Sequence, residues 1–432
     1  RPKGVLMHHR GISNYFQWGV EGYGAAGGNG APVFSSMAVD LTLTNFLPLF
    51  VGGRVVLVRE GPGIDALAEL LEQKPRFSLL KITPTHLALL NERITPELAR
   101  SSTHVLVIGA DNLLAETTLF WQEHAPDVVL LNEYGPTETV VGCSIHPLVR
   151  GKQREGPVPI GRPIDNITMY VLDGNQEPVP IGVPGELYIG GIGVARGYHD
   201  RAALTAKAFV PDPFAATPGA RLYRTGDRAR WRADGELEFL GRVDHQVKIR
   251  GYRIEIGEIE TVLSAHPQVR EVFVMAREDG PGERRLVAYV VAEEPAPTTS
   301  ALRQALKERL PDYMIPQAFV FLEALPLASS GKVDRQALPA PDTSRPGLDD
   351  AYTPPTTPLE HRLVRIWEAV LGVRPIGTTD NFFDIGGSSI VAVRLLARIR
   401  KEFGRDLPLT VLVNEGTIRG VADWLGEVPV AD

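Results

Sequence analysis

The segment NEYGPTETVVG, residues 132–142, carries an aromatic ring, a hydroxyl and a carboxylate close together. It follows a strand-like run, and open α/β sheets bind ligands beyond the carboxyl ends of their strands. Tyr134 could stack on a flat base and Thr137 could donate to a phosphate. Glu138 could hold Mg²⁺, which prefers carboxylate and phosphate oxygens. The alternative is an ordinary surface turn.

Two other turns each present one charged side chain. YRTGD, residues 223–227, ends in Asp227, whose carboxylate could accept from both hydroxyls of a ribose; a turn aspartate can also satisfy its own backbone. LASSGKVDR places Lys332 in a glycine loop, where a cation suits a developing phosphoryl or carboxylate charge. The alternative is a solvated lysine. SSGK lacks the upstream spacing of a P-loop.

The segment DIGGSSI, residues 384–390, places two serines before a predicted helix. Apolar residues recur every four positions from Val391 to Phe403, and Gly404 is a plausible stop. Locally, a serine here reads as an N-cap. Two glycines beside a helix N-terminus would also suit a serine that bears a phosphodiester, since free N–H groups favour phosphate.

Elements that could position these side chains follow in order. Residues 1 to about 145 alternate strand-like and helix-like runs, which predicts an α/β fold with a largely parallel sheet. The strand-like runs are 54–60, 105–111 and 128–135, and the helix-like runs are 64–73 and 84–92. Residues 146 to 243 look β-rich, with strands at 185–191 and 235–242 between Gly and Pro turns.

The rest of the chain predicts two smaller units joined by a linker. Residues 245–340 show strand patterns at 271–278 and 285–294 and a helix at 300–310. A Pro-, Asp- and Thr-rich stretch at 339–358 is typical of a linker. About 70 residues with helical patterns follow, which indicates a small tethered bundle.

Composition narrows the class of protein. The 432 residues carry a net charge of −7, spread along the chain, and this gives no reason to expect nucleic acid or an anionic membrane as a partner. No apolar run approaches the roughly 18 residues needed to span a bilayer. The single cysteine, Cys143, excludes an internal disulfide and fits the reducing cytoplasm.

The order of the motifs is far more specific than any one of them. RPKGV, NEYGPTE, GELYIGG, YRTGD, GRVDHQVKIRGYRIEIGEIE and LPLASSGKVDR, then LPAPD and DNFFDIGGSSI, resemble the adenylation domain and peptidyl carrier domain of a nonribosomal peptide synthetase, in the ANL adenylate-forming superfamily. The resemblance implies an α/β adenylate-forming core with a β-rich subdomain, a small α+β subdomain and a four-helix carrier bundle. The expected boundaries are core 1–243, mobile subdomain 244–340, linker 341–357 and carrier 358–430.

The resemblance also implies an activity. Such an enzyme activates an amino acid with ATP as aminoacyl-AMP and loads it as a thioester on the phosphopantetheine arm of its carrier. Two alternatives remain: an acyl- or aryl-CoA ligase, and a carrier or docking module with an inert adenylation remnant. Asp40 and the carrier motif argue against the first, and intact Asp227, Glu138 and Lys332 argue against the second. The family's phosphate loop should precede RPKGV, so we expect the chain alone to be incompetent.

Residue roles carry over by position in the motifs. Tyr134, Gly135 and Thr137 would bind the nucleotide, Asp227 with Arg242 its ribose, and Glu138 the Mg²⁺. Lys332 would bridge substrate carboxylate and nucleotide, and Asp244 would be the hinge. Ser389 would carry phosphopantetheine, with Ser388 in a position that is more usually His or Asp. A phosphopantetheinyl transferase and neighbouring condensation or other synthetase domains would be partners, and the need for an MbtH-like protein stays open.

A substrate prediction follows from VDLTLTNF, residues 39–46, which matches the family's pocket segment. Asp40 would pair with the α-ammonium and Lys332 with the carboxylate. The set resembles those of asparagine-activating domains; its other members are Leu41, Thr44, Lys81, Val107, Gly109, Glu133, Val141 and Gly142. Two glycines would leave room, while Lys81 donors and Glu133 acceptors would suit a carboxamide. Alternatively, Lys81 and Glu133 pair only with each other, and the substrate is selected by its size. Aspartate and glutamine rank behind asparagine.

Overall fold

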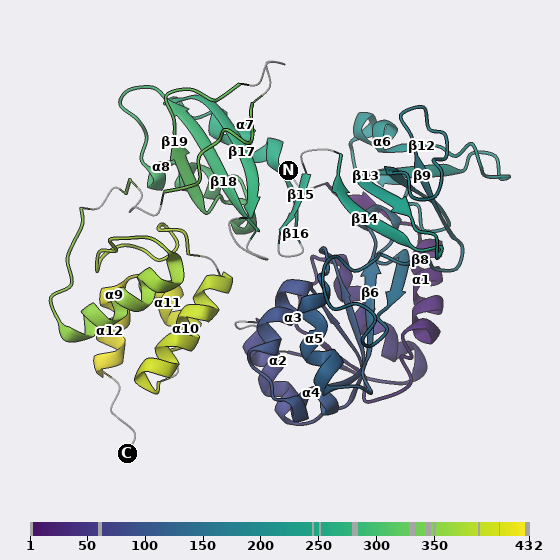
Figure 1. Cartoon of the computed structure of the whole chain (residues 1–432), viewed down its shortest axis with the longest axis horizontal. Coiled ribbons are helices and arrows are strands. Elements are labelled where there is room, and N and C mark those ends of the chain that lie inside the picture. Colours follow the sequence, from purple (N-terminus) through teal and green to yellow (C-terminus); the bar gives the residue numbers. More distant parts are fainter. Residues whose placement is uncertain are drawn as a thin grey trace. The chain divides into compact units, whose positions relative to one another are not determined.

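The computed structural model describes residues 3–58, 63–243, 246–249, 252–278, 284–327, 333–342, 347–348, 351–387, 389–405 and 407–427. The chain divides into two compact units, residues 1–244 with 250–252, and residues 245–249 with 253–432 (Figure 1). Within the described residues, none of the helices combines the length and the apolar character needed to cross a membrane.

A five-stranded sheet forms the centre of the first unit. Its order is β4 (Phe77–Ile82), β5 (Thr103–Gly109), β6 (Val129–Tyr134), β7 (Ser144–Pro147) and β8 (Arg162–Pro163). The first three strands run parallel and the last two pair antiparallel, so the prediction of a largely parallel sheet holds for β4 to β6. All six residues of β4 are buried, as expected for a strand covered on both faces.

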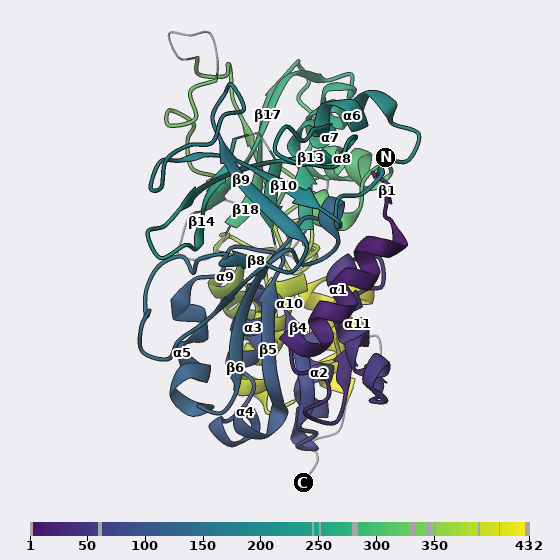
Figure 2. The ribbon, with the colours of Figure 1, turned by 90° about the vertical axis from the view of Figure 1, so that its right-hand side faces the viewer.

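Helices cover both faces of this sheet. The α1 helix (His9–Gly22) lies on one face, and α2 (Gly63–Glu72), α3 (Pro84–Asn91), α4 (Pro96–Ser102) and α5 (Ala115–His124) lie on the other (Figures 1 and 2). Two caps are visible in the sequence: the Thr83 and Thr95 hydroxyls each accept a backbone N–H of α3 or α4, with a proline next in line. Residues 40–51 form a 3-10 helix, η1 (Asp40–Val51), and β2 (Ala31–Val33) pairs in parallel with β3 (Val55–Leu57).

The β-rich part of the first unit is a second sheet. Its strands follow the order β12 (Phe209–Pro211), β13 (Arg221–Trp231), β10 (Gly185–Gly191) and β9 (Ile167–Leu172), and β14 (Leu237–Arg242) also pairs with β13. All of these pairings are antiparallel. A small pair, β1 (Val5–Leu6) with β11 (Gly197–Tyr198), precedes α6 (Ala202–Ala208). Strand β10 has the limits that its flanking turns predict.

The second unit begins with β15 (Gln246–Ile249) and β16 (Tyr252–Glu255), which pair with each other. A three-stranded sheet follows, β17 (Val269–Glu278), β18 (Arg284–Ala292) and β19 (Ala318–Phe321), with α7 (Ile256–Ser264), α8 (Thr299–Lys307) and the short η3 (Asp312–Met314). Val274, Leu286 and Leu302 are among the apolar residues of its core. These elements match the strand, strand and helix patterns of the sequence.

The C-terminal part of the second unit is a four-helix bundle of α9 (Pro358–Leu371), α10 (Ser389–Phe403), α11 (Leu409–Glu415) and α12 (Ile418–Glu427). Thr357 and Glu360 form a capping box at the start of α9, and Trp367 and Phe382 meet edge to face in the core. Gly404, with φ of 68°, donates its N–H to the Arg400 carbonyl at the end of α10, which confirms the predicted stop.

Candidate functional site

Three predicted nucleotide-binding residues meet at the carboxyl end of the parallel strand β6. Tyr134 ends β6, and its hydroxyl donates to Asp227 of β13. Asp227 also accepts from Arg242, its partner in the β13–β14 register. Burial raises the pKa of Tyr134 well above its usual value, which keeps the hydroxyl a neutral donor. The fold thus brings together Tyr134, Asp227 and Arg242 from three strands.

Glu138 lies in the short helix η2 (Thr137–Thr139) and is buried. Its Oε1 accepts from the Tyr198 hydroxyl at 2.6 Å. The sequence did not predict a role for Tyr198, which ends β11, 60 residues further along the chain. The one general signal is that the hydroxyl of a buried tyrosine usually has a hydrogen-bond partner. A buried carboxylate of this kind suits Mg²⁺, which takes one or two protein carboxylates plus phosphate oxygens and water.

The backbone between residues 138 and 142 is strained. Val140 and Val141 both have left-handed dihedrals, with φ of 68° and 57°. This region is unfavourable for β-branched residues, and such strain persists where the surroundings impose it, often at functional sites. Gly135 packs directly under this turn, because a Cβ there would collide with the Val141 carbonyl oxygen.

Asp40 begins η1 and has an unsatisfied carboxylate oxygen. Its Oδ2 is shielded from solvent and has no hydrogen-bond partner among the residues that the structure describes. Burial raises the pKa of Asp40, a Thr137 hydrogen bond opposes the rise, and the charges of Glu133 and Glu138 add to it. A buried acid beside two others, with one oxygen left over, is suited to receive a cation such as an α-ammonium.

Lys81 and Glu133 form a buried ion pair across the ends of β4 and β6, with side-chain exposures of 1% and 4%. In the structure these two residues therefore pair with each other, as the alternative prediction stated. The predicted glycines make space for this pair. A Cβ at Gly109 would lie 2.8 Å from Lys81 Nζ, and one at Gly142 would collide with the Glu133 carboxylate.

Other predicted pocket residues are also buried, and two of them lie beside this pair in the sheet. Val107 on β5 pairs in register with Lys81, and Gly109 with Glu133. Leu41, Thr44 and Val141 are 7%, 0% and 4% exposed. The sequence did not point to Tyr15 on α1 or to Tyr23 at its C-cap, yet both hydroxyls donate to Glu133.

Three predicted residues fall outside the described residues: Lys332, Asp244 and Ser388. Ser389 is described as the first residue of α10, but its side chain is outside the description. The roles of these four residues stay predictions.

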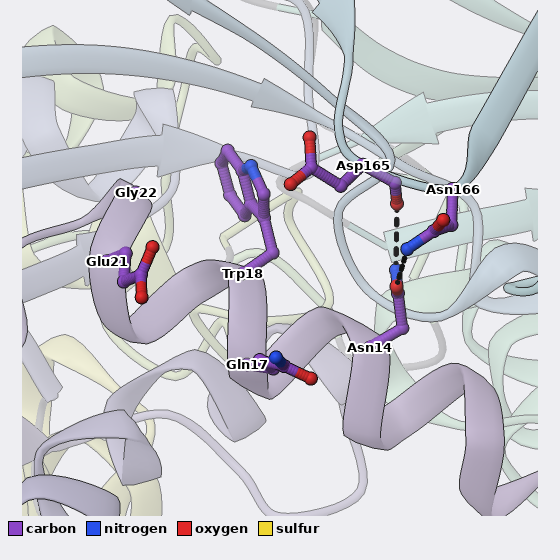
Figure 3. A pocket seen from close by; sticks show the side chains of 7 residues that line it. All are labelled: Asn14, Gln17, Trp18, Glu21, Gly22, Asp165 and Asn166. Carbon is purple, nitrogen blue, oxygen red and sulfur yellow. Dashed lines mark hydrogen bonds between the residues drawn. The ribbon is translucent and has the colours of Figure 1, made fainter.

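A separate cavity of about 360 Å³ opens between α1 and the residues before β9 (Figure 3). Asn14 Nδ2 donates to the Asp165 carbonyl at 2.9 Å, and Asn166 Nδ2 donates to Asn14 Oδ1 at 2.7 Å. The lining residues are Asn14, Gln17, Trp18, Glu21, Gly22, Asp165 and Asn166, and none of the predicted site residues is among them.

Three family models match successive segments of the chain. Residues 1–199 match the model of the AMP-binding enzymes, residues 258–332 match the AMP-binding enzyme C-terminal domain, and residues 361–425 match the phosphopantetheine attachment site. A mycosubtilin synthase polypeptide of Bacillus subtilis is 44% identical over 425 residues, which are 98% of this chain and 16% of that protein. Phosphinothricin tripeptide synthetase PhsC of Streptomyces viridochromogenes is 42% identical over 427 residues, 98% of this chain and 38% of the relative.

Solved structures give the same result. Holo-PA1221, an NRPS protein containing adenylation and PCP domains bound to a vinylsulfonamide inhibitor, has a TM-score of 0.79 and 26% identity, covering 98% of this chain and 70% of that one. Holo-AB3403, a four-domain nonribosomal peptide synthetase bound to AMP and glycine, has a TM-score of 0.51 and 33% identity, covering 99% and 32%.

The chain spans less than a fifth of the length of the first three curated relatives, at 16%, 8% and 7%. The matched models define the class: AMP-binding enzymes, which form adenylates. Within that class, the chain belongs to the nonribosomal peptide synthetases, as an adenylation domain with its carrier domain. The family prediction made from the ordered motifs is confirmed.

Proposed function

We propose that the chain activates an amino acid with ATP as aminoacyl-AMP and loads it as a thioester on its own carrier domain. The observation that carries this proposal is the unsatisfied oxygen of Asp40, in the same unit as the Tyr134–Asp227–Arg242 cluster and the Glu138 loop. One site thus offers an anchor for an α-ammonium and groups suited to a nucleotide.

Each residue has a defined part in this reaction. Asp40 holds the α-ammonium, so the substrate carboxylate can attack the α-phosphorus of ATP. A carboxylate oxygen forms the new bond to phosphorus, the bond from phosphorus to the bridging oxygen breaks, and pyrophosphate leaves. Glu138 would hold Mg²⁺, which neutralises charge on the phosphates. Lys332 would stabilise the charge on the two reacting groups, and Asp227 with Arg242 would position the ribose.

Asparagine is the proposed substrate. Lys81 and Glu133 form an ion pair, so neither charge of the pair is left without a partner to attract an acidic or basic side chain. A lysine ammonium has three donors and a carboxylate has about four acceptor sites, which leaves capacity for a further partner on each. A carboxamide offers both an acceptor and donors. Glutamine would add a methylene, typically worth about 10–200-fold in selectivity.

Loading requires Ser389 to carry phosphopantetheine, which supplies the thiol that takes the aminoacyl group from AMP. Ser389 begins α10, and a helix N-terminus favours an attached phosphate through its free N–H groups. The proposed partners are a phosphopantetheinyl transferase and neighbouring synthetase domains, with an MbtH-like protein left as a question for reconstitution. The single buried Cys143 is compatible with the proposed cytoplasmic location.

The test is ATP–pyrophosphate exchange with each proteinogenic amino acid, using the synthetase that carries this chain. Asparagine should give the highest exchange, and Asp40→Ala should abolish it. Exchange that leads with an apolar amino acid would refute the pocket assignment. Aryl or acyl acids transferred to free coenzyme A would favour the ligase alternative, and absence of exchange with any substrate would favour an inert remnant.

A further inference from the structure

Three side chains donate to Glu133, and a fourth contacts one of the donors. Tyr15 Oη donates to Glu133 Oε1 at 2.9 Å, and Tyr23 Oη donates to the same oxygen. Lys81 donates to Oε2. The Thr44 hydroxyl lies 2.7 Å from Tyr15 Oη. All five residues are buried, so water cannot replace a missing partner without rearrangement.

The donors and acceptors of this cluster fix its hydrogen positions. The Tyr15 proton goes to Glu133, so the contact between Thr44 and Tyr15 is made by the Thr44 hydroxyl donating to the phenol oxygen. Burial raises the pKa of both tyrosines well above the usual value, and the Glu133 charge adds to the rise. Both phenols therefore stay neutral and donate to Glu133.

We propose that Tyr15 and Tyr23 are positioning residues that set the side-chain selectivity of this pocket for a neutral carboxamide over a carboxylate. They hold Oε1 of Glu133 on the side of α1 and leave Oε2, beside Lys81, as the edge that a substrate amide can meet. A substrate carboxylate carries no hydrogen to donate to this edge. This inference rests on the proposed function.

The alternative is that both tyrosines are only core residues. Tyr15 and Tyr23 belong to the main apolar cluster of the first unit, and their rings pack at 6.5 Å between centroids. Replacing either by Phe keeps the ring and removes only the hydroxyl, so the two roles can be separated. A core role predicts an equal loss for every substrate, whereas a positioning role changes the ratio between substrates.

The direction of the change follows from the hydrogen bonds. Without a phenol donor, Oε1 loses a partner and the Glu133 carboxylate is no longer held with Oε2 toward the substrate. The preference for a side chain that donates a hydrogen to Oε2 then weakens. Hydrogen bonds to charged groups are worth enough for each Tyr→Phe change to lower the asparagine-to-aspartate ratio on the order of 10-fold.

The experiment measures kcat/KM by ATP–pyrophosphate exchange for asparagine, aspartate and glutamine, with the synthetase that carries this chain. Tyr15→Phe and Tyr23→Phe are compared with Tyr188→Phe, a matched control. Tyr188 is a buried tyrosine on β10 that hydrogen-bonds Glu186, away from the pocket residues in sequence. We expect the asparagine-to-aspartate ratio to fall in both pocket variants and to stay constant in Tyr188→Phe.

A second background keeps the inference testable if one variant folds poorly. In Glu133→Gln the group that the phenols act on is neutral, so adding Tyr15→Phe or Tyr23→Phe should leave the ratio unchanged. A first choice of an apolar amino acid by the unaltered enzyme would refute the asparagine assignment and this role together. With asparagine preferred, equal losses for all three substrates would overturn the role of the tyrosines alone.

Discussion

Breaking the Lys81–Glu133 pair should be costly for the first unit. Replacement of Lys81 by Met keeps most of the apolar stem and removes the ammonium, leaving Glu133 buried and short of one partner. The side chains are 1% and 4% exposed, which places the pair in the class whose disruption costs about 3–5 kcal/mol. Tyr15 and Tyr23 still donate to Glu133, so we expect the lower half of that range.

Amide hydrogen exchange across β4 to β6 measures this cost, because protection in core strands reports the free energy of opening. Lys74→Met is the matched control: Lys74 pairs with Glu97 at the surface, with side chains 52% and 74% exposed, and its loss should change protection little. The double variant Lys81→Met with Glu133→Gln should recover part of the loss, since it removes the unpaired charge. Equal effects of Lys81→Met and Lys74→Met, or simple additivity in the double variant, would refute the reasoning.

Four further predictions concern the rest of the chain. Ser389→Ala should abolish the mass gain from a phosphopantetheinyl transferase while Ser388→Ala keeps it, and the reverse result would move the site. Asp244→Pro, by fixing φ, should slow thioester loading far more than adenylate formation; unchanged loading would argue against a hinge. Thr357→Ala should cost α9 about 1 kcal/mol in exchange protection. Backbone hydrogen bonds from Thr356 and then Thr357 lower the pKa of Glu360, so its support of α9 should be lost as pH falls from 4.5 through the lowered pKa of the folded state.

The sequence predicted elements best where local signals mark both ends. Strand β10 has the expected limits because glycines bound a short run. No element was assigned to residues 39–46, which lie in η1 apart from Val39, its N-cap. A twelve-residue 3-10 helix that contains Pro48 is unusual, since such helices are mostly short.

The site was predicted as a set of residues but only partly as a geometry. Resemblance supplied Lys81 and Glu133, whereas the donors Tyr15 and Tyr23 lie 118 and 110 positions from Glu133 in sequence. Helical periodicity marks a face as buried without naming its partners. The two glycines were expected to leave room for substrate, yet their space is taken by the ion pair. Residue size is readable from a sequence, but which neighbour fills the space is decided by sheet register.

The strained turn at Val140 and Val141 connects the two parts of the proposed site. Glu138 lies before the turn and Gly142 after it, so one short segment serves the proposed magnesium site and the proposed side-chain pocket. Each left-handed β-branched residue costs on the order of 1–3 kcal/mol, which only a well-packed surrounding can offset. Here the Val141 carbonyl rests against Gly135, and the Gly142 Cα lies against Glu133. A shift of Glu133 therefore has a direct steric path to the loop that carries Glu138, and through this path the proposed side-chain pocket and the proposed magnesium site would be coupled.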